Sequence, residues 1–133
     1  MKRSLSVFMT IVMLVCTLCL AGCDTKYKSS FDAVGCVHNN TSDHAMLKFS
    51  SFKGTMVFKF DVKDKSSLSY KMKLDEGSAD FYYDNGSSKK KSCSINAGAD
   101  FDGGISNLKE GTLYVIIETN KKCKGGDFEF DID

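Results

Sequence analysis

The chain has 133 residues, a length typical of one domain, and its 26% charged and 42% hydrophobic residues are the balance of a globular protein. This composition excludes a chain that is disordered throughout. The formal net charge is only +1 at pH 7, so no strong electrostatic field of either sign is expected and we predict no nucleic-acid partner.

The first segment, residues 1–22, has the features of a secretory signal peptide. Lys2 and Arg3 precede an apolar run from Val7 to Leu20 that is interrupted only by two threonines. A run of this length is short for a membrane-spanning helix and fits the helical core of a signal peptide.

The apolar run ends in Leu20-Ala21-Gly22-Cys23, which resembles a bacterial lipobox, where a lipoprotein signal peptidase cuts before the cysteine. The resemblance implies a diacylglycerol on the Cys23 thiol, with fatty acyl chains such as palmitate. An ordinary secretory signal is the alternative, but small residues would then be expected where Leu20 stands. We therefore expect a lipoprotein attached to the cell membrane on its extracytoplasmic face.

The polar residues after the lipobox predict a tether, followed by one domain. Residues 23–30 form this lipidated tether, and residues 31–133 form the domain. From residue 31 onward, apolar and polar residues alternate, which is the period of strands with one solvent-facing side. Residues 113–117 are instead almost wholly apolar, which favours a central strand covered on both faces. The predicted strands cover residues 46–49, 56–62, 68–74, 80–84, 113–117 and 127–133.

Glycine-containing turns are expected between these strands. They lie at residues 53–54, 75–77, 84–86, 103–104, 110–111 and 125–126. Asn85-Gly86 is the strongest hairpin signal, because both residues tolerate a positive φ. No helix is predicted after the signal peptide. The predicted fold class is therefore all-β, a single antiparallel β-sandwich of jelly-roll type.

Three segments carry a resemblance to a known family. They are residues 78–86 (SADFYYDNG), 105–115 (ISNLKEGTLYV) and 125–130 (GGDFEF). Residues 56–132 resemble the bacterial pre-peptidase C-terminal type of jelly-roll β-sandwich, an accessory module of secreted proteins. The chain departs from that pattern at Ala79-Asp80-Phe81, where acid-x-acid-Leu is usual, and at Cys123, which interrupts the last hairpin. The resemblance implies an extracytoplasmic β-sandwich with a binding role.

The cysteines predict at most one disulfide. They are Cys16, Cys19, Cys23, Cys36, Cys93 and Cys123. The first two lie in the signal peptide and the third takes the lipid, so three thiols are left and no C-x-x-C among them indicates zinc. If one bridge forms, we predict that it joins Cys93 to Cys123, because both are expected at the ends of strands. The other pairings and a fully reduced chain stay open.

Residues that could carry catalysis or bind metal are few. His38 and His44 lie in a polar segment, residues 37–44, that we interpret as a solvent-exposed loop. A His-Asp-His metal site with Asp43 and a Cys36–His38 nucleophile pair are alternatives, but the spacings are not diagnostic and no orienting group or oxyanion motif accompanies them. We therefore expect no enzyme, no cofactor and no metal site.

Two further patterns could serve binding. Asp100-Phe101-Asp102-Gly103-Gly104 is similar to a fragment of a calcium loop, but we interpret it as a turn beside exposed acids. Asp127, Glu129, Asp131 and Asp133 form an acidic row, which we interpret as the solvent face of an edge strand.

Exposed aromatic rings on a β-sandwich indicate ligand binding. The candidates for such ligand-facing aromatics are Tyr82, Tyr83 and Tyr114, of which alternation places Tyr82 and Tyr83 on opposite faces of their strand.

The function that these observations favour is a membrane-anchored bacterial lipoprotein that displays a non-enzymatic β-sandwich binding module. Its partner would be an envelope or extracellular protein or glycan. The alternative is an inhibitor or immunity-type lipoprotein that inserts a loop into a hydrolase.

Overall fold

The computed structural model describes residues 26–133, so the predicted signal-peptide helix and Cys23 lie outside the described residues. The strands are β1 (Ser30–Val34), β2 (Val37–Asn40), β3 (His44–Val62), β4 (Ser66–Glu76), β5 (Ser78–Asp84), β6 (Lys90–Asn96), β7 (Asp100–Leu108) and β8 (Gly111–Ile132). All strand pairs are antiparallel, which confirms the all-β prediction. Within the described part of the chain, no helix is long and apolar enough to cross a membrane.

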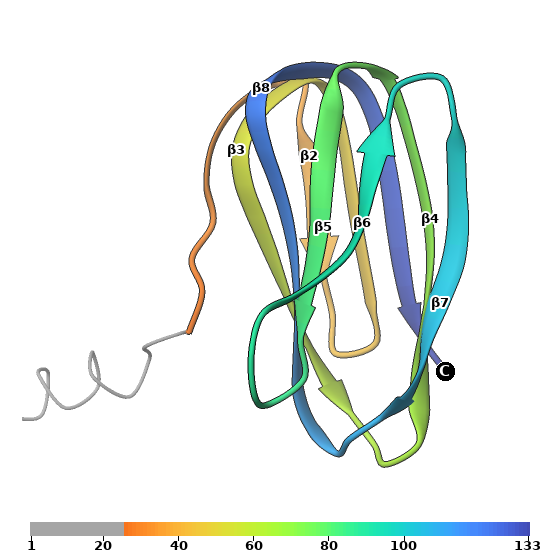
Figure 1. Ribbon diagram of the computed structural model, residues 1–133. Helices are drawn as coiled ribbons and strands as arrows, with labels where there is room; N and C mark the ends of the chain where they lie inside the picture. The colour runs from red at the N-terminus through yellow and green to blue at the C-terminus, as the bar shows by residue number, and fades with distance from the viewer. Residues whose placement is uncertain (1–25) are drawn as a thin grey trace, which may run out of the picture.

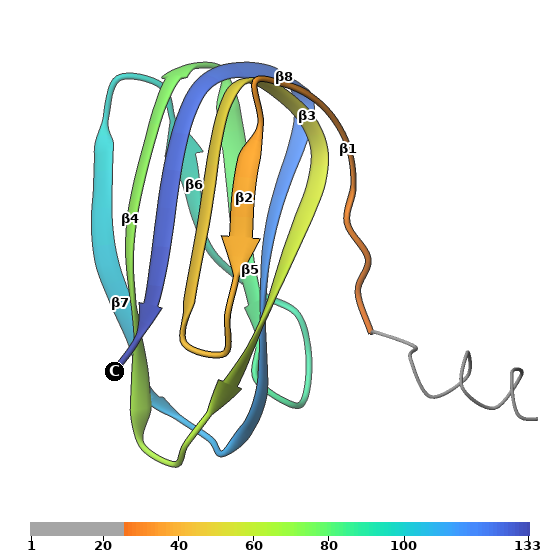
Figure 2. The same cartoon turned by 180° about the vertical axis from the view of Figure 1, so that it is seen from behind.

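Two long strands, β3 and β8, pair along their whole length and bend together from one layer of the sandwich into the other (Figure 1). In the first layer, the strands follow the order β2-β3-β8-β4-β7, with residues 44–52 of β3 and 123–132 of β8. In the second layer, the order is β3-β8-β5-β6, with residues 54–62 of β3 and 111–119 of β8. Figure 2 shows the molecule from the opposite side, where β2 of the first layer is nearest the reader.

The bend lies where a turn was expected. The register of β3 and β8 shifts between Phe52 and Gly54, where Lys53 alone faces residues 120–122 of β8. Gly54 has a φ of 127°, and a Cβ there would lie 2.3 Å from the Ser30 carbonyl oxygen. The prediction of a turn at 53–54 is therefore wrong: the glycine makes a bulge that bends β3 and lets β1 approach closely.

The glycines at 103–104 and 125–126 also lie inside strands, β7 and β8, rather than in turns. Two of them, Gly103 and Gly126, leave room for aromatic rings. A Cβ on Gly126 would lie 2.2 Å from the Phe49 ring, and one on Gly103 would lie 2.7 Å from the Tyr70 hydroxyl. The turn signals at 75–77, 84–86 and 110–111 do separate consecutive strands, as predicted.

The polar segment 37–44 is also not a loop throughout, because it contains β2 and the start of β3. The side chains of β2 are all exposed, which explains why its sequence lacks the apolar alternation of a strand. β2 is an edge strand that needs no buried face, since β3 supplies its backbone hydrogen bonds.

The interior lies between the two layers and consists of the residues that the alternation indicated. Phe58 and Phe60 of β3 and Phe128 and Phe130 of β8 are each at most 1% exposed. Residues 113–117 form the predicted central strand, between β3 and β5, and Ile116 is buried although it points away from the main core.

All three cysteines of the described residues are free thiols, so the Cys93–Cys123 bridge is not formed in this structure. Cys93 pairs with Phe81 in the second layer, whereas Cys123 pairs with Phe52 at the bend in the first layer. Cys123 lies inside a long strand rather than at the end of one, and its thiol donates a hydrogen bond to the Phe52 carbonyl oxygen at 3.3 Å. The expected position at a strand end was therefore wrong for Cys123.

Candidate functional site

The outer face of the first layer, which we name the charged face, is covered by side chains of both charges. Its members are His44, Met46, Lys48, Ser69, Lys71, Lys73, Asp100, Asp102, Asp127, Glu129 and Asp131. The cross-strand register alternates the charges. Lys73 lies between Asp127 and Asp100, and Lys71 lies between Glu129 and Asp102. Carboxylates thus outnumber lysines, and the face is acidic.

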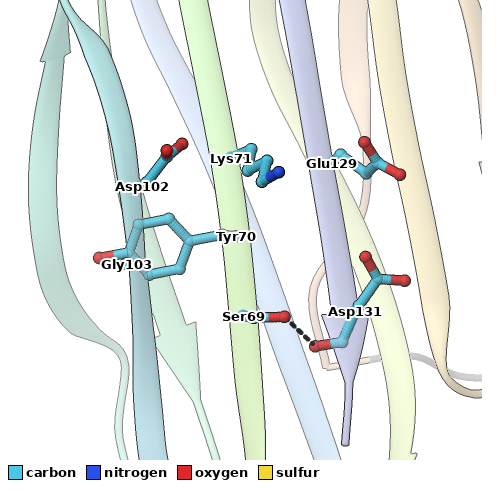
Figure 3. A pocket seen from close by; sticks show the side chains of 7 residues that line it. All are labelled: Ser69, Tyr70, Lys71, Asp102, Gly103, Glu129 and Asp131. Atoms are coloured by element: carbon cyan, nitrogen blue, oxygen red, sulfur yellow. Dashed lines mark hydrogen bonds between the residues drawn. The ribbon is translucent and has the colours of Figure 1, made fainter.

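The charged face contains two adjoining shallow depressions of about 230 and 300 Å³. Figure 3 shows the first, where Lys71 lies between Asp102 and Glu129 and the Ser69 hydroxyl is 3.5 Å from the Asp131 carbonyl oxygen. The acidic row of β8 therefore lines two depressions and lies on a central strand. The prediction of an edge strand was wrong because β4 and β7 extend the layer beyond β8.

His44 begins β3 and lies on the charged face. Its Nδ1 atom is 2.6 Å from Asp131 Oδ1, on the residue directly opposite in β8. His38 is elsewhere: it pairs with Leu47 and its ring lies edge-on to Phe31, with 6.1 Å between centroids. The structure therefore does not bring His38 and His44 together as a metal site. It instead places His44 beside acids that are more than 80 residues away in sequence, for which the sequence holds no signal.

Serine, histidine and aspartate meet on the charged face without forming a catalytic triad. In a triad, the histidine stands between the serine and the carboxylate, so that it can take the serine proton. Here Asp131 lies between His44 and Ser69, opposite each of them on neighbouring strands. In this order the histidine is not next to the serine, so the three residues do not have the arrangement of a triad.

The outer face of the second layer, which we name the tyrosine face, carries two of the three predicted aromatics. Tyr82 lies opposite Ile116, and Tyr114 lies opposite Asp84 and Lys59. The ammonium group of Lys89 lies over the Tyr82 ring, 4.3 Å from its centroid. Tyr83 points the other way and packs against the core, so its ring is not part of this face.

The tether is fixed to the tyrosine face through Asp84, whose side chain is only 1% exposed. Lys26 Nζ and the Tyr27 hydroxyl each donate a hydrogen bond to Asp84 Oδ2, at 2.6 and 2.7 Å, and the Gly86 amide donates to Oδ1 at 3.0 Å. The Tyr27 ring also packs edge-on against Tyr114, with 5.2 Å between centroids. We name this arrangement the Asp84 clasp.

The clasp shifts the pKa of both Asp84 and Tyr27. Burial raises the pKa of Asp84, but the hydrogen bonds from Lys26, Tyr27 and Gly86 outweigh it and hold the pKa below its usual range. Burial and the neighbouring Asp84 carboxylate together raise the pKa of Tyr27 to about 12. At neutral pH the clasp is therefore a charged carboxylate that accepts hydrogen bonds from an ammonium group and a neutral phenol.

No protein-family model matches the chain, and no curated protein matches it. Among solved structures, it is similar to a periplasmic lysozyme inhibitor of g-type lysozyme from Aeromonas hydrophila, with 15% identity over 69% of this chain and 88% of that one (TM-score 0.46). It is also similar to a carbohydrate-binding module, TmCBM61, in complex with β-1,4-galactotriose, with 12% identity over 82% and 88% (TM-score 0.47).

A further similar structure is the pre-peptidase C-terminal domain of a collagenase from Bacillus anthracis, with 11% identity over 79% of this chain and 89% of that one (TM-score 0.45). It belongs to the type of domain that residues 56–132 resemble. Similarities at this level assign no function to the chain.

Proposed function

We propose that the protein is a membrane-anchored bacterial lipoprotein whose non-enzymatic β-sandwich binds an envelope or extracellular protein or glycan through the charged face. The observation that supports this proposal is the Asp84 clasp, because it holds Lys26 and Tyr27, which follow the proposed lipid site, against the tyrosine face. The tyrosine face and the charged face are the outer faces of opposite layers, so they point in opposite directions.

The clasp orients the domain relative to the lipid. Cys23 is three residues before Lys26, and three extended residues span only about 10 Å. A lipid on Cys23 therefore holds the tyrosine face beside the membrane. The charged face then points away from the membrane, toward the rest of the envelope.

The charged face has the chemistry of a surface for polar partners. Its side chains supply ammonium donors, carboxylate acceptors and the Ser69 hydroxyl around the two depressions. Its ion pair between Lys48 and Asp127 is long, 3.9 Å, and more than half exposed, so it contributes little and can be exchanged for contacts with a partner. The position of Asp131 between His44 and Ser69 supports binding rather than catalysis.

Lipidation is tested with the full chain expressed in a bacterium that is fed labelled palmitate. We expect the label on the wild type and none on the Cys23→Ala variant, because the thiol is the only group that the transfer reaction can use. A Cys36→Ala variant is the control and keeps the label. Equal labelling of the Cys23→Ala variant would contradict the anchor.

Partner binding is tested by retention of the solubilised full chain on isolated cell-wall material and by cross-linking in intact cells. Reversing charges on the charged face, with Lys71→Glu and Asp102→Lys made separately, should reduce both signals. Lys59→Glu on the tyrosine face is the matched control and should leave them unchanged. Loss in the Lys59→Glu variant alone would show that the wrong face was chosen.

The inhibitor alternative has one observation in its favour, an ordered loop between β5 and β6. Asn85 accepts a hydrogen bond from the Lys109 amide at 2.8 Å and donates one to the Lys109 carbonyl oxygen at 3.1 Å, which joins this loop to the β7–β8 turn. If this loop is inserted into a hydrolase, Asn85→Ala should abolish inhibition of that hydrolase, while the charge reversals leave inhibition intact.

A further inference from the structure

We propose that His44, Glu129 and Asp131 form a binding site for a divalent transition-metal ion at one end of the charged face. One imidazole nitrogen and two carboxylate oxygens, one from each residue, all lie within 4.8 Å of one another. This site goes beyond the proposed function, because neither the membrane anchor nor partner binding requires a metal ion.

The register of the two long strands brings the three groups together. His44 and Asp131 are directly opposite each other in β3 and β8. Glu129 precedes Asp131 by two residues, and the period of a strand therefore places it on the same face. The three side chains thus project from two paired strands, and none of them lies on a long loop.

The backbone at this end of the sheet is closed by hydrogen bonds. The Thr41 amide donates to the His44 carbonyl oxygen at 2.7 Å, and the His44 amide donates to the Thr41 hydroxyl at 3.0 Å. The Ile132 amide donates to the Asp43 carbonyl oxygen at 2.8 Å, which ties the end of β8 to the same turn. The Cα atoms of His44 and Asp131 are therefore held in place before any ion arrives.

The ligand chemistry selects the class of ion. One nitrogen and two carboxylate ligands suit a borderline divalent ion such as Zn²⁺, whereas Ca²⁺ and Mg²⁺ prefer oxygen ligands alone. Zinc ligands stand about 2.0–2.2 Å from the ion and hence about 3 to 3.5 Å from one another. Rotation of side chains on the exposed face is enough to reach this geometry. Three protein ligands leave a coordination position for water or for a group of a partner.

The surrounding charges favour a cation. Lys71 lies opposite Glu129, and Ser69 lies opposite Asp131. Asp102 lies opposite Lys71 on the far side and compensates its charge. Asp131 has His44 and Ser69 as its cross-strand neighbours, whereas Asp127 and Asp100 have only lysines, and it is this histidine that distinguishes the proposed site from the other acids of the charged face.

The test is a titration of the full chain with Zn²⁺, followed by calorimetry. The chain is purified in detergent without a polyhistidine tag, and accessible thiols are alkylated so that cysteines do not compete. We expect one Zn²⁺ per chain. His44→Gln and Glu129→Gln should weaken binding at least about tenfold, since loss of even an outer-shell partner weakens metal sites about 10- to 100-fold.

Two control variants separate a defined site from general attraction to an acidic surface. His38→Gln removes the other histidine, and Asp127→Asn removes an acid of the same face that is outside the cluster; both should keep the wild-type affinity. The proposal is overturned if no saturable Zn²⁺ site exists, if His44→Gln binds like the wild type, or if Asp127→Asn weakens binding as much as Glu129→Gln does.

A readout without substitutions covers the case in which a variant fails to fold. In nuclear magnetic resonance spectra of the wild-type chain, Zn²⁺ should shift the imidazole signals of His44 and leave those of His38 in place. Equal shifts of both histidines, or none, would also overturn the proposal. Retention on cell-wall material is measured separately with the Lys71→Glu variant, so failure of the metal site and failure of the proposed function are distinguishable.

Discussion

Asp84 shows how one residue can decide how the tether is held. A carboxylate that is 1% exposed is unfavourable unless its oxygens accept hydrogen bonds, and the bonds come from Lys26, Tyr27 and Gly86. Lys26 lies 58 residues before Asp84, so nothing in the local sequence predicts the contact. Residues 23–30 were expected to be a simple tether, yet Lys26 and Tyr27 supply hydrogen bonds to a buried carboxylate.

We predict that Asp84→Asn lowers the free energy of unfolding by about 1.5–3 kcal/mol at pH 7, the usual contribution of a hydrogen bond to a charged group. The pKa of Asp84 is lower in the folded chain than its usual value near 4, so its stabilisation is present above that value and is lost as the pH falls through the folded pKa. Urea unfolding at several pH values should show the variant and the wild type converging in acid.

Asp80→Asn is the matched control for this prediction. Asp80 is on the same strand and pairs with Lys91, but its side chain is 32% exposed. We expect a smaller loss at pH 7, because solvent screens the Lys91 pair. A loss as large as that of Asp84→Asn would show that burial of the clasp is not what matters.

At the scale of elements, the long bent strands β3 and β8 determine the fold. The sequence predicts two strands in each of these regions, at 46–49 and 56–62 and at 113–117 and 127–133, and the structure joins each pair through the bend. The periodicity on both sides of the bend was correct. The joining depends on Gly54, whose sequence context indicates a turn but which lies at the bulge, where β1 pairs closely with β3.

We predict that Gly54→Ala destabilises the fold more than Gly111→Ala does. Both glycines have a positive φ, 127° and 133°, so both substitutions introduce backbone strain of about 1–3 kcal/mol. A Cβ on Gly111 meets nothing within 4 Å, whereas one on Gly54 would collide with the Ser30 carbonyl oxygen. Thermal melts of both variants measure the difference, and equal losses would mean that β1 yields easily.

At the scale of the whole molecule, aromatic rings join the two layers. Phe130 in the first layer contacts Phe58 and Phe81 in the second, with ring centroids 5.8 and 5.6 Å apart. Tyr70 of β4 also packs against Phe81, at 5.1 Å. One continuous core therefore holds both layers, so we expect the sandwich to unfold as a unit.

We predict that Phe60→Ala costs about 3–5 kcal/mol, the usual loss for a buried phenylalanine. Phe60 is 0% exposed, and domains of this size are stable by only about 5–15 kcal/mol. The variant should therefore melt much earlier or be largely unfolded. Phe101→Ala, at a half-buried phenylalanine of β7, is the control with the smaller loss. Unchanged melting of Phe60→Ala would contradict the assigned core.

We also predict that the three thiols of the domain react at very different rates with iodoacetamide. Burial raises the pKa of all three, but Cys36 and Cys93 are partly exposed whereas Cys123 is 0% exposed and hydrogen-bonded. Cys123 should react only when the whole sandwich unfolds, at a rate that denaturant increases steeply. Peptide mapping assigns the label to each cysteine, and early labelling of Cys123 would indicate local opening at the bend.

The amino-acid sequence by itself determined the all-β class, the strand period and most of the core, because alternation of apolar residues is a local property. Phe58, Phe60, Phe128 and Phe130 could be placed inside from their spacing alone. The sequence could not show that β2 and β7 are strands, since these lie at the edges of the first layer and bury few side chains.

Only the tertiary structure decided which glycines turn the chain and which make room for a neighbour, as Gly126 does for Phe49. It also decided the sites. His44 meets Asp131 across 87 residues of sequence, and Lys26 meets Asp84 across 58. Such contacts follow from the register of strands that are paired by backbone hydrogen bonds, and register between distant strands is set by the packing of the whole core rather than by the residues that meet.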